Sequence, residues 1–227
     1  MHFVRLLLLC NAAVLLAYIA DAAIRTPSSE PSRMLDLDGE ANLPTWYSSA
    51  KLLVLGLLLG IFAKDRIRTA GSLHGYGILL IMPALSLALS LDEVAMIHEW
   101  IGQLSDSLLP TGHRSATALS RTGIWMFLLG VPFLVVTALA WTRFIHVVHV
   151  NRRAVRLYLS GFAAHVASAL GTEILSNFVS GAAYVAQVAT EEFGEMVGVT
   201  LMIGGSLELL RSYGIDVRSA QRPGQAP

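Results

Sequence analysis

The chain has 227 residues, of which 54% are hydrophobic and only 14% charged, and its formal net charge is zero. A soluble domain usually carries about 25% charged residues, so the composition favours a membrane protein. The zero net charge gives no electrostatic basis for nucleic-acid binding, and the single cysteine, Cys10, excludes an internal disulfide or a thiolate metal site.

The apolar runs predict an all-α fold, a polytopic membrane bundle of about six transmembrane helices. A helix needs roughly 20 mostly apolar residues to cross a bilayer, and these segments approach that length: Phe3–Ala23, Trp46–Ala63, Gly75–Leu91, Gly123–Trp141, Leu157–Asn177 and Glu195–Tyr213. The third and sixth are expected to continue outward past their apolar cores. We therefore expect one helix-bundle domain over residues 1–213, with an outer loop over 24–45 and a disordered tail over 214–227.

The first segment allows a second interpretation. The start "MHFVR", an apolar stretch and the small residues around Asp21 also fit a secretory signal peptide with a cleavage site. Both alternatives remain open at this point.

The outer loop contains "DLDGEAN", Asp36–Asn42, with polar residues at alternate positions around Gly39. A calcium-binding EF-hand needs its glycine at the sixth position, whereas here it is the fourth. A turn with solvated acids is therefore predicted. Apolar residues of the same loop are expected to lay it on the mouth of the bundle: Met34, Leu35, Leu37 and Leu43.

The distribution of basic residues predicts how the chain is oriented in the membrane. If there are six spans, one side collects Arg5, Lys64, Arg66, Arg68, Arg143, Arg152, Arg153, Arg156, Arg211, Arg218 and Arg222. Cytoplasmic loops carry such an excess of arginine and lysine. Both termini are therefore expected in the cytoplasm, and the acidic residues on the outer side.

The end of the third segment, "SLDEVAMIHEWIG", carries an acidic stripe. Asp92 and Glu99 are seven residues apart, so a continuous helix would place them within about 20° of each other. Glu93 and His98 would flank them. The stripe is predicted to turn inward, because lipid offers a carboxylate no partner.

The fifth and sixth segments add further acids at the same outer depth. Glu191, Glu192 and Glu195 share one face of the sixth, and Glu173 lies near the outer end of the fifth. His165, two turns deeper, is expected to be a buried histidine hydrogen-bonded to a neighbouring helix. The small residues Gly194 and Gly198 would allow helices to approach closely.

Three explanations of this cluster stay open. The acids are solvated or paired with Arg114 and Arg121, or they bind a divalent cation, or they relay protons. The candidate metal ligands are Asp92, His98, Glu99, Glu173, Glu191, Glu192 and Glu195. Carboxylates with imidazole suit Mn, Fe or Zn. The chain lacks the Glu-x-x-His motif of di-iron bundles.

Two stretches, "LDLDGEANLPTWYSS" (Leu35–Ser49) and "LSLDEVAMIHE" (Leu89–Glu99), resemble stretches of uncharacterised bacterial multi-pass membrane proteins. The resemblance implies a bacterial cell inner membrane and attaches no function. Two functional classes remain. One is a metal- or proton-dependent membrane enzyme or transporter, and the other is a non-catalytic accessory subunit that pairs with a membrane partner or with its own copies. The sequence does not decide whether the protein is an enzyme.

Overall fold

The computed structural model describes residues 2–24, 34–71, 76–109, 112–148 and 151–215. These residues form helices and connecting turns, with no strand among them. In chain order the elements are α1 (His2–Ile24), α2 (Leu43–Ala70), the 3₁₀ helix η1 (Gly77–Leu80), α3 (Ile81–Ala95), α4 (Ile97–Asp106), the 3₁₀ helix η2 (Arg114–Ala116), the π-helical η3 (Met126–Gly130), α5 (Val131–Val148), α6 (Arg152–Val166), the π-helical η4 (Ala167–Thr172), α7 (Glu173–Ser176) and α8 (Ala182–Ser212).

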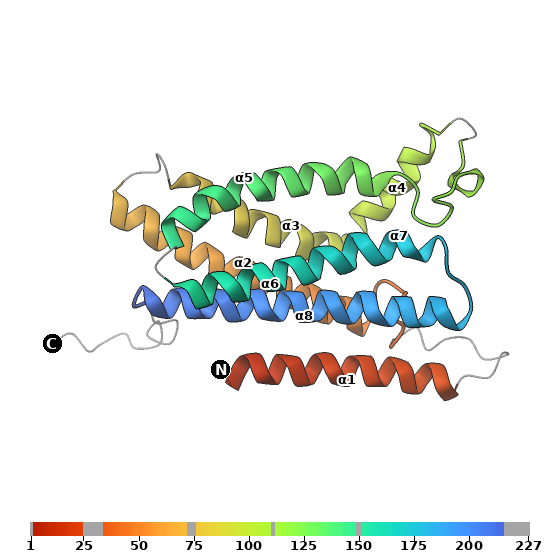
Figure 1. Cartoon of the computed structure of the whole chain (residues 1–227), viewed down its shortest axis with the longest axis horizontal. Helices are drawn as coiled ribbons and strands as arrows, with labels where there is room; N and C mark the ends of the chain where they lie inside the picture. Colours follow the sequence, from red (N-terminus) through yellow and green to blue (C-terminus); the bar gives the residue numbers. More distant parts are fainter. Residues whose placement is uncertain (1, 25–33, 72–75, 110–111, 149–150, 216–227) are drawn as a thin grey trace.

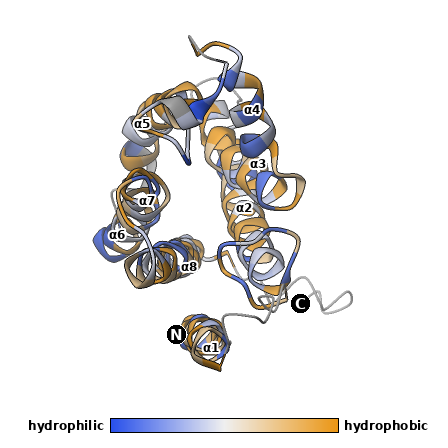
Figure 2. Ribbon diagram, turned by 90° about the vertical axis from the view of Figure 1, so that its right-hand side faces the viewer, coloured by the Kyte–Doolittle hydropathy of each residue, from blue (hydrophilic) through white to orange (hydrophobic). Residues whose placement is uncertain are grey.

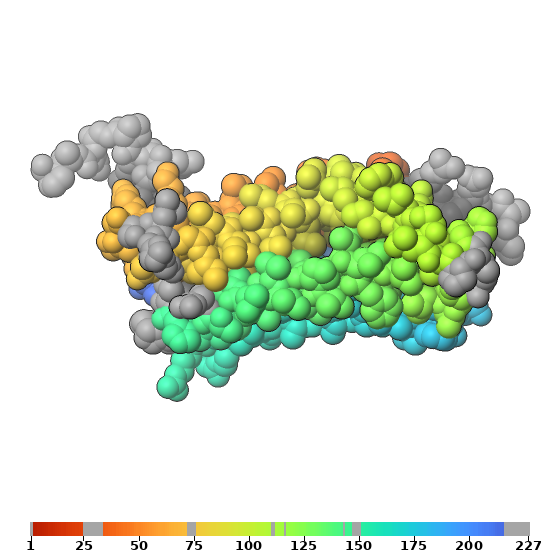
Figure 3. Space-filling model, turned by 90° about the horizontal axis from the view of Figure 1, so that it is seen from above, coloured from red at the N-terminus to blue at the C-terminus, as the bar shows by residue number. Residues whose placement is uncertain are grey.

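The long helices run up and down one axis, and the short α4 and α7 lie at the same end of the bundle (Figure 1). We call this the α4 end. Seen along the axis, the helices form a ring, and α1 lies outside it against α8 (Figure 2). From above, α5 lies beside α3 on one face of the molecule (Figure 3). All-helical architecture is what the apolar runs predicted.

Five helices are long and apolar enough to cross a membrane: His2–Ile24, Leu43–Ala70, Gly77–Ala95, Met126–His146 and Ala182–Ser212. The predicted segment Leu157–Asn177 is not among them, because it is divided between α6, η4 and α7. The number six is therefore not confirmed. The predicted disordered tail lies outside the described residues from 216 onward.

Capping residues define both ends of α2. Asn42 caps α2, since its side chain accepts a hydrogen bond from the Thr45 backbone N–H at 3.1 Å, and Pro44 occupies the first turn. Gly71 ends α2 with φ of 66°, a left-handed conformation that glycine adopts at little cost.

Opposite the α4 end, aromatic side chains fill the bundle. Phe62 packs edge-on against Phe144 and Tyr213, with ring centroids 6.1 and 5.3 Å away. Trp141 stacks on the buried Tyr158 at 5.3 Å. This aromatic cluster joins α2, α5, α6 and α8, and it closes that end of the bundle with apolar surface.

Close contact between α6 and α8 depends on glycine. A β-carbon on Gly161 would lie 2.5 Å from the Gly198 carbonyl oxygen, and one on Gly205 would lie 2.9 Å from the Ala154 carbonyl oxygen. The backbones can approach this closely only where side chains are absent. The prediction of close approach is confirmed at Gly194 and Gly198, where a β-carbon would collide with Ser168 and with Gly161 and His165.

Candidate functional site

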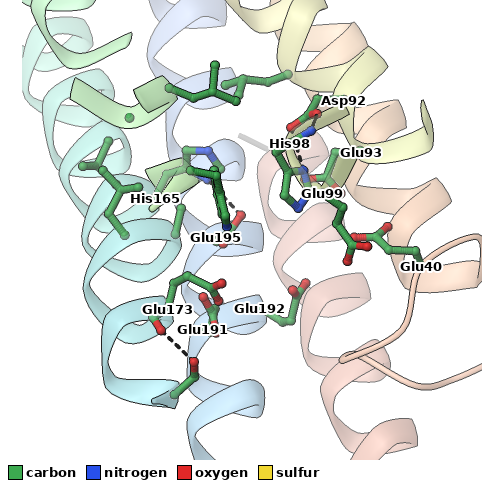
Figure 4. A pocket seen from close by; sticks show the side chains of 18 of the residues that line it. Glu40, Asp92, Glu93, His98, Glu99, His165, Glu173, Glu191, Glu192 and Glu195 are labelled. Atoms are coloured by element: carbon green, nitrogen blue, oxygen red, sulfur yellow. Dashed lines mark hydrogen bonds and ion pairs between the residues drawn. The ribbon is translucent and has the colours of Figure 1, made fainter. Parts of the chain in front are cut away.

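A cavity of about 560 Å³ occupies the α4 end of the bundle. Its walls come from the loop before α2 and from α2, α3, α4, η3, α5, α6, η4, α7 and α8. The cavity is lined by every candidate ligand predicted above: Asp92, His98, Glu99, Glu173, Glu191, Glu192 and Glu195. Figure 4 shows these side chains on two opposing sides of one space.

The two acid-bearing helices, α3 and α8, are not direct packing partners. The main packing partner of α3 is α2, whereas α8 packs chiefly on α6, α2 and α1. Their acids instead face one another across the cavity (Figure 4).

The predicted continuous stripe from Asp92 to Glu99 is wrong, because the helix breaks between them. Met96 has φ of 55° and ψ of 38°, which ends α3 and starts α4 in a new direction. Asp92 then bonds the new helix: its Oδ1 accepts from the His98 backbone N–H at 2.8 Å, and its Oδ2 lies 2.9 Å from His98 Nδ1. Asp92 is thus a partner of His98 and orients its ring.

Glu40, which was predicted to lie in a turn with solvated acids, also lines the cavity. The Asn42 side chain donates hydrogen bonds of 2.6 Å to the carbonyl oxygens of Asp36 and Gly39, which holds the turn together. Leu37 is buried beside Tyr18 and holds the loop on the bundle, as predicted, whereas Met34 and Leu43, from which the same was expected, are exposed. Glu40 is half-buried, and its Oε2 has no hydrogen-bond partner among the described residues.

Glu40, His98 and Glu99 form the tightest set of ligand atoms in the cavity. One ligand atom from each lies within 4.8 Å of the others, and no other such group of three occurs within the described ranges. Because Nδ1 of His98 is bonded to Asp92, Nε2 is the nitrogen left for a cation. In metal sites, a carboxylate commonly accepts a hydrogen bond from the other nitrogen of the metal-bound imidazole and so fixes the orientation of the ring.

The opposite wall carries the acids of α7 and α8. Glu191 is buried, and its Oε2 accepts a hydrogen bond from Gln187, which also donates to the Thr172 carbonyl at 3.1 Å. His165 Nδ1 lies 3.7 Å from Glu195 Oε2, and it has no hydrogen-bond partner within the part of the chain that the structure describes. The prediction that His165 is buried is confirmed, and its Nδ1 does not take part in the predicted hydrogen bond to a neighbouring helix.

Few cations balance these acids. Arg114 pairs with Asp106 at 2.8 Å, so it does not neutralise the cluster. Arg121 lines the cavity, donates to the Ser176 carbonyl at 2.7 Å and covers the Tyr184 ring at 4.3 Å. Lys51 is 3% exposed and donates to Asn11 Oδ1 at 3.2 Å and to the Met196 carbonyl at 3.1 Å.

Burial and the excess of acids shift the pKa values of the cavity residues that lie outside the membrane-spanning helices. Burial raises the pKa of Glu40, and the charge of His98 opposes this. Burial raises the pKa of Asp38, against the hydrogen bond from Tyr184. Burial by itself would lower the pKa of His98, but the hydrogen bond and charge of Asp92, with the charges of Glu40 and Glu99, raise it above its ordinary value. Because both pKa values are raised, protons compete with a cation for Glu40 and His98 up to a higher pH than at ordinary side chains.

The sequence missed Glu40 and the apolar part of the cavity. The residues that anchor this turn could be recognised in the sequence, since Leu37 is apolar and Asn42–Pro44 is typical of a helix start. The sequence contains no indication that the turn faces His98, since the two are joined only through the tertiary fold.

A family model described as a domain of unknown function (DUF8692) matches residues 4–208. The chain belongs to this family, which agrees with the resemblance to uncharacterised proteins seen in the sequence. No curated protein and no solved structure matches the chain.

Proposed function

We propose that this member of the DUF8692 family is a metal-dependent enzyme of the bacterial inner membrane that binds a divalent cation through Glu40, His98 and Glu99. The observation that carries the proposal is the convergence of these three ligand atoms within 4.8 Å. They come from the outer loop and from α4, so the fold and not local sequence brings them together.

The coordination chemistry favours a transition metal. Two carboxylates and one imidazole form a mixed oxygen and nitrogen set, which suits Mn, Fe or Zn better than Ca or Mg. Three protein ligands leave positions for water or for a substrate group, as in catalytic metal sites. Those positions would open into the cavity, where the acids of α8 can act as proton acceptors.

The shape of the bundle favours an enzyme over a channel. The cavity lies at the α4 end, and the aromatic cluster around Phe62 fills the other end. A substrate can therefore enter and leave at one end of the bundle without crossing it.

The proposed topology has six crossings with both termini in the cytoplasm. Five are the long apolar helices, and the sixth is the rod formed by α6, η4 and α7, which lies along α8 (Figure 1). The C-terminal end of α2, the start of α6 and the end of α8, which carry Lys64, Arg152 and Arg211, lie opposite the α4 end (Figure 1), and this supports a cavity that faces the periplasm. A reporter fused after residue 110 should be periplasmic, and one fused after residue 150 cytoplasmic. Either fusion on the other side would contradict this topology.

Elemental analysis of the protein purified without chelator tests the metal site. We expect one divalent transition metal per chain, lost in both Glu99→Gln and His98→Gln. The matched control is Glu173→Gln, which removes an acid from the opposite wall and should keep the metal. Absence of metal from the wild type after reconstitution with Mn, Fe or Zn would refute the proposal, and loss in the control alone would move the site to the other wall.

A further inference from the structure

The cavity has an apolar part next to its acidic part. Its lining includes large apolar side chains from α3, η3, α5, α6 and η4: Leu85, Leu89, Leu129, Phe133, Val166 and Leu170. A smaller cavity of about 20 Å³ shares Leu85, Leu89 and Phe133 with it. The combined space therefore suits a molecule with one polar end and one apolar end, within the roughly 300–1,000 Å³ range of small-molecule sites.

His165 lies where the two parts meet. It lines both the large and the small cavity, and it is 7% exposed. Its Nδ1 has no hydrogen-bond partner among the described residues, and Glu195 Oε2 lies 3.7 Å away, too far for a hydrogen bond. An unsatisfied buried nitrogen is costly, so a ligand atom that bonds both groups would complete the site.

The charge of the cavity lining determines which polar group of a ligand it can bind. Nine acidic side chains line it: Asp38, Glu40, Asp92, Glu93, Glu99, Glu173, Glu191, Glu192 and Glu195. Arg121 and two histidines are the basic residues in the same lining. Lys51, behind this wall, is already engaged by Asn11 and the Met196 carbonyl. Even with a bound dication, the lining repels a carboxylate or phosphate head and attracts an ammonium.

The local backbone supports a binding role for this region. Both η3 and η4 are π-helical, and each contributes lining residues, among them Leu129 and Leu170. Single π-helical turns inside α-helices occur frequently at functional sites. The two segments meet where a β-carbon on Gly130 would lie 3.3 Å from Leu170 Cδ2.

We propose that the cavity binds a long-chain primary amine, whose ammonium bridges His165 Nδ1 and Glu195 Oε2 and whose chain lies along Leu129, Phe133 and Leu170. The ammonium donates one N–H to the neutral imidazole and another to the carboxylate, which a quaternary ammonium cannot do. This inference rests on the proposed function in treating the cavity as the substrate site, and it names the class of substrate.

The test uses the full chain in lipid nanodiscs and a dodecylamine that carries a photoreactive diazirine at the end of its chain. Mass spectrometry should locate the label in peptides containing Leu129, Phe133 or Leu170. Unlabelled dodecylamine should compete, whereas dodecanoic acid and dodecyltrimethylammonium should compete about tenfold less well. Labelling confined to lipid-facing residues, or equal competition by dodecanoic acid, would overturn the proposal.

Variants give an independent check. His165→Phe should reduce specific labelling about tenfold, and His165→Gln, which keeps an acceptor oxygen, should retain most of it. Leu170→Trp fills the chain site and should abolish labelling, whereas the same change at the exposed Leu139 should not. If Leu170→Trp is folded and still labelled like the wild type, the chain site is wrong.

The two proposals can fail separately. Labelling is measured with and without EDTA, and in Glu99→Gln, in which the metal ligand is lost but His165 and Glu195 remain. Labelling of wild-type protein that holds no metal even after reconstitution would refute the metal site alone. Stoichiometric metal without labelling at the cavity would refute the amine site alone.

Discussion

Gly198 is the position at which one methyl group should most directly disturb the candidate site. A β-carbon there would lie 2.6 Å from the Gly161 carbonyl oxygen and 2.7 Å from the His165 backbone nitrogen. Ordinary van der Waals contacts of a β-carbon begin at 3.4 Å. In Gly198→Ala, α6 and α8 must therefore separate by several tenths of an ångström, and His165 moves with α6.

Gly60→Ala is the matched control. Gly60 lies inside α2, and a β-carbon there would be 3.9 Å from Pro83 Cβ, an ordinary contact. Both variants gain the same helix propensity, about 1 kcal/mol for alanine over glycine, so this gain cancels in their comparison. Overpacking costs about 1–3 kcal/mol. Gly198→Ala should therefore have a free energy of unfolding about 1–3 kcal/mol below that of Gly60→Ala.

The measurement is unfolding in mixed micelles by titration with sodium dodecyl sulfate, followed by tryptophan fluorescence. Labelling of the cavity by the photoreactive amine provides the second readout, and it should fall in Gly198→Ala but not in Gly60→Ala. Equal stability and equal labelling of the two variants would refute the close α6–α8 contact on which the position of His165 depends.

Four further predictions follow from other contacts. In Asn11→Leu, Lys51 and Tyr47 lose their acceptor and Thr200 loses its donor, and all three residues are buried or half-buried. The free energy of unfolding in the same titration should therefore fall by about 1–3 kcal/mol. An unchanged midpoint would contradict this network. Asp92→Asn should weaken metal binding about 10–100-fold in a chelator competition, because it loses the charge that supports the His98 ring; undiminished affinity would remove Asp92 from the site. Metal affinity should decrease as the pH falls through the raised pKa values of His98 and Glu40, since each then binds a proton that the metal must displace; calorimetry showing no pH dependence would exclude these ligands. Phe62→Ala should cost about 3–5 kcal/mol, because Phe62 is 1% exposed in the aromatic cluster, and a loss well below this range would show that the cluster is loosely packed.

The raised pKa of His98 also has a consequence for stability. A histidine with a raised pKa in the folded state stabilises the fold at low pH, where it is protonated in both states. That contribution is lost as the pH rises through the folded-state pKa. The metal acts in the opposite direction, since it binds the deprotonated ring, so metal-free and metal-loaded protein should differ most in stability at high pH.

The sequence by itself determined the helical class, and it led us to expect the acids at one end of the bundle. Helix length and polarity follow from local composition, because the bilayer sets how long an apolar run must be. The spacing of Glu191, Glu192 and Glu195 predicted one shared helix face, and all three line the same cavity as Glu173. The small residues at Gly194 and Gly198 correctly indicated close helix packing, since the absence of a side chain is a local property.

Only the tertiary structure decided which of these acids come together. The break at Met96 occurs at a non-glycine residue with positive φ, which no local signal marks, and it separates Asp92 from Glu99. Glu40 reaches His98 because Leu37 and the Asn42 cap hold a distant loop on the bundle. The unpartnered nitrogen of His165 depends on how closely α6 approaches α8. Convergence of this kind comes from contacts between segments far apart in the chain, and periodicity within one segment carries no information about them.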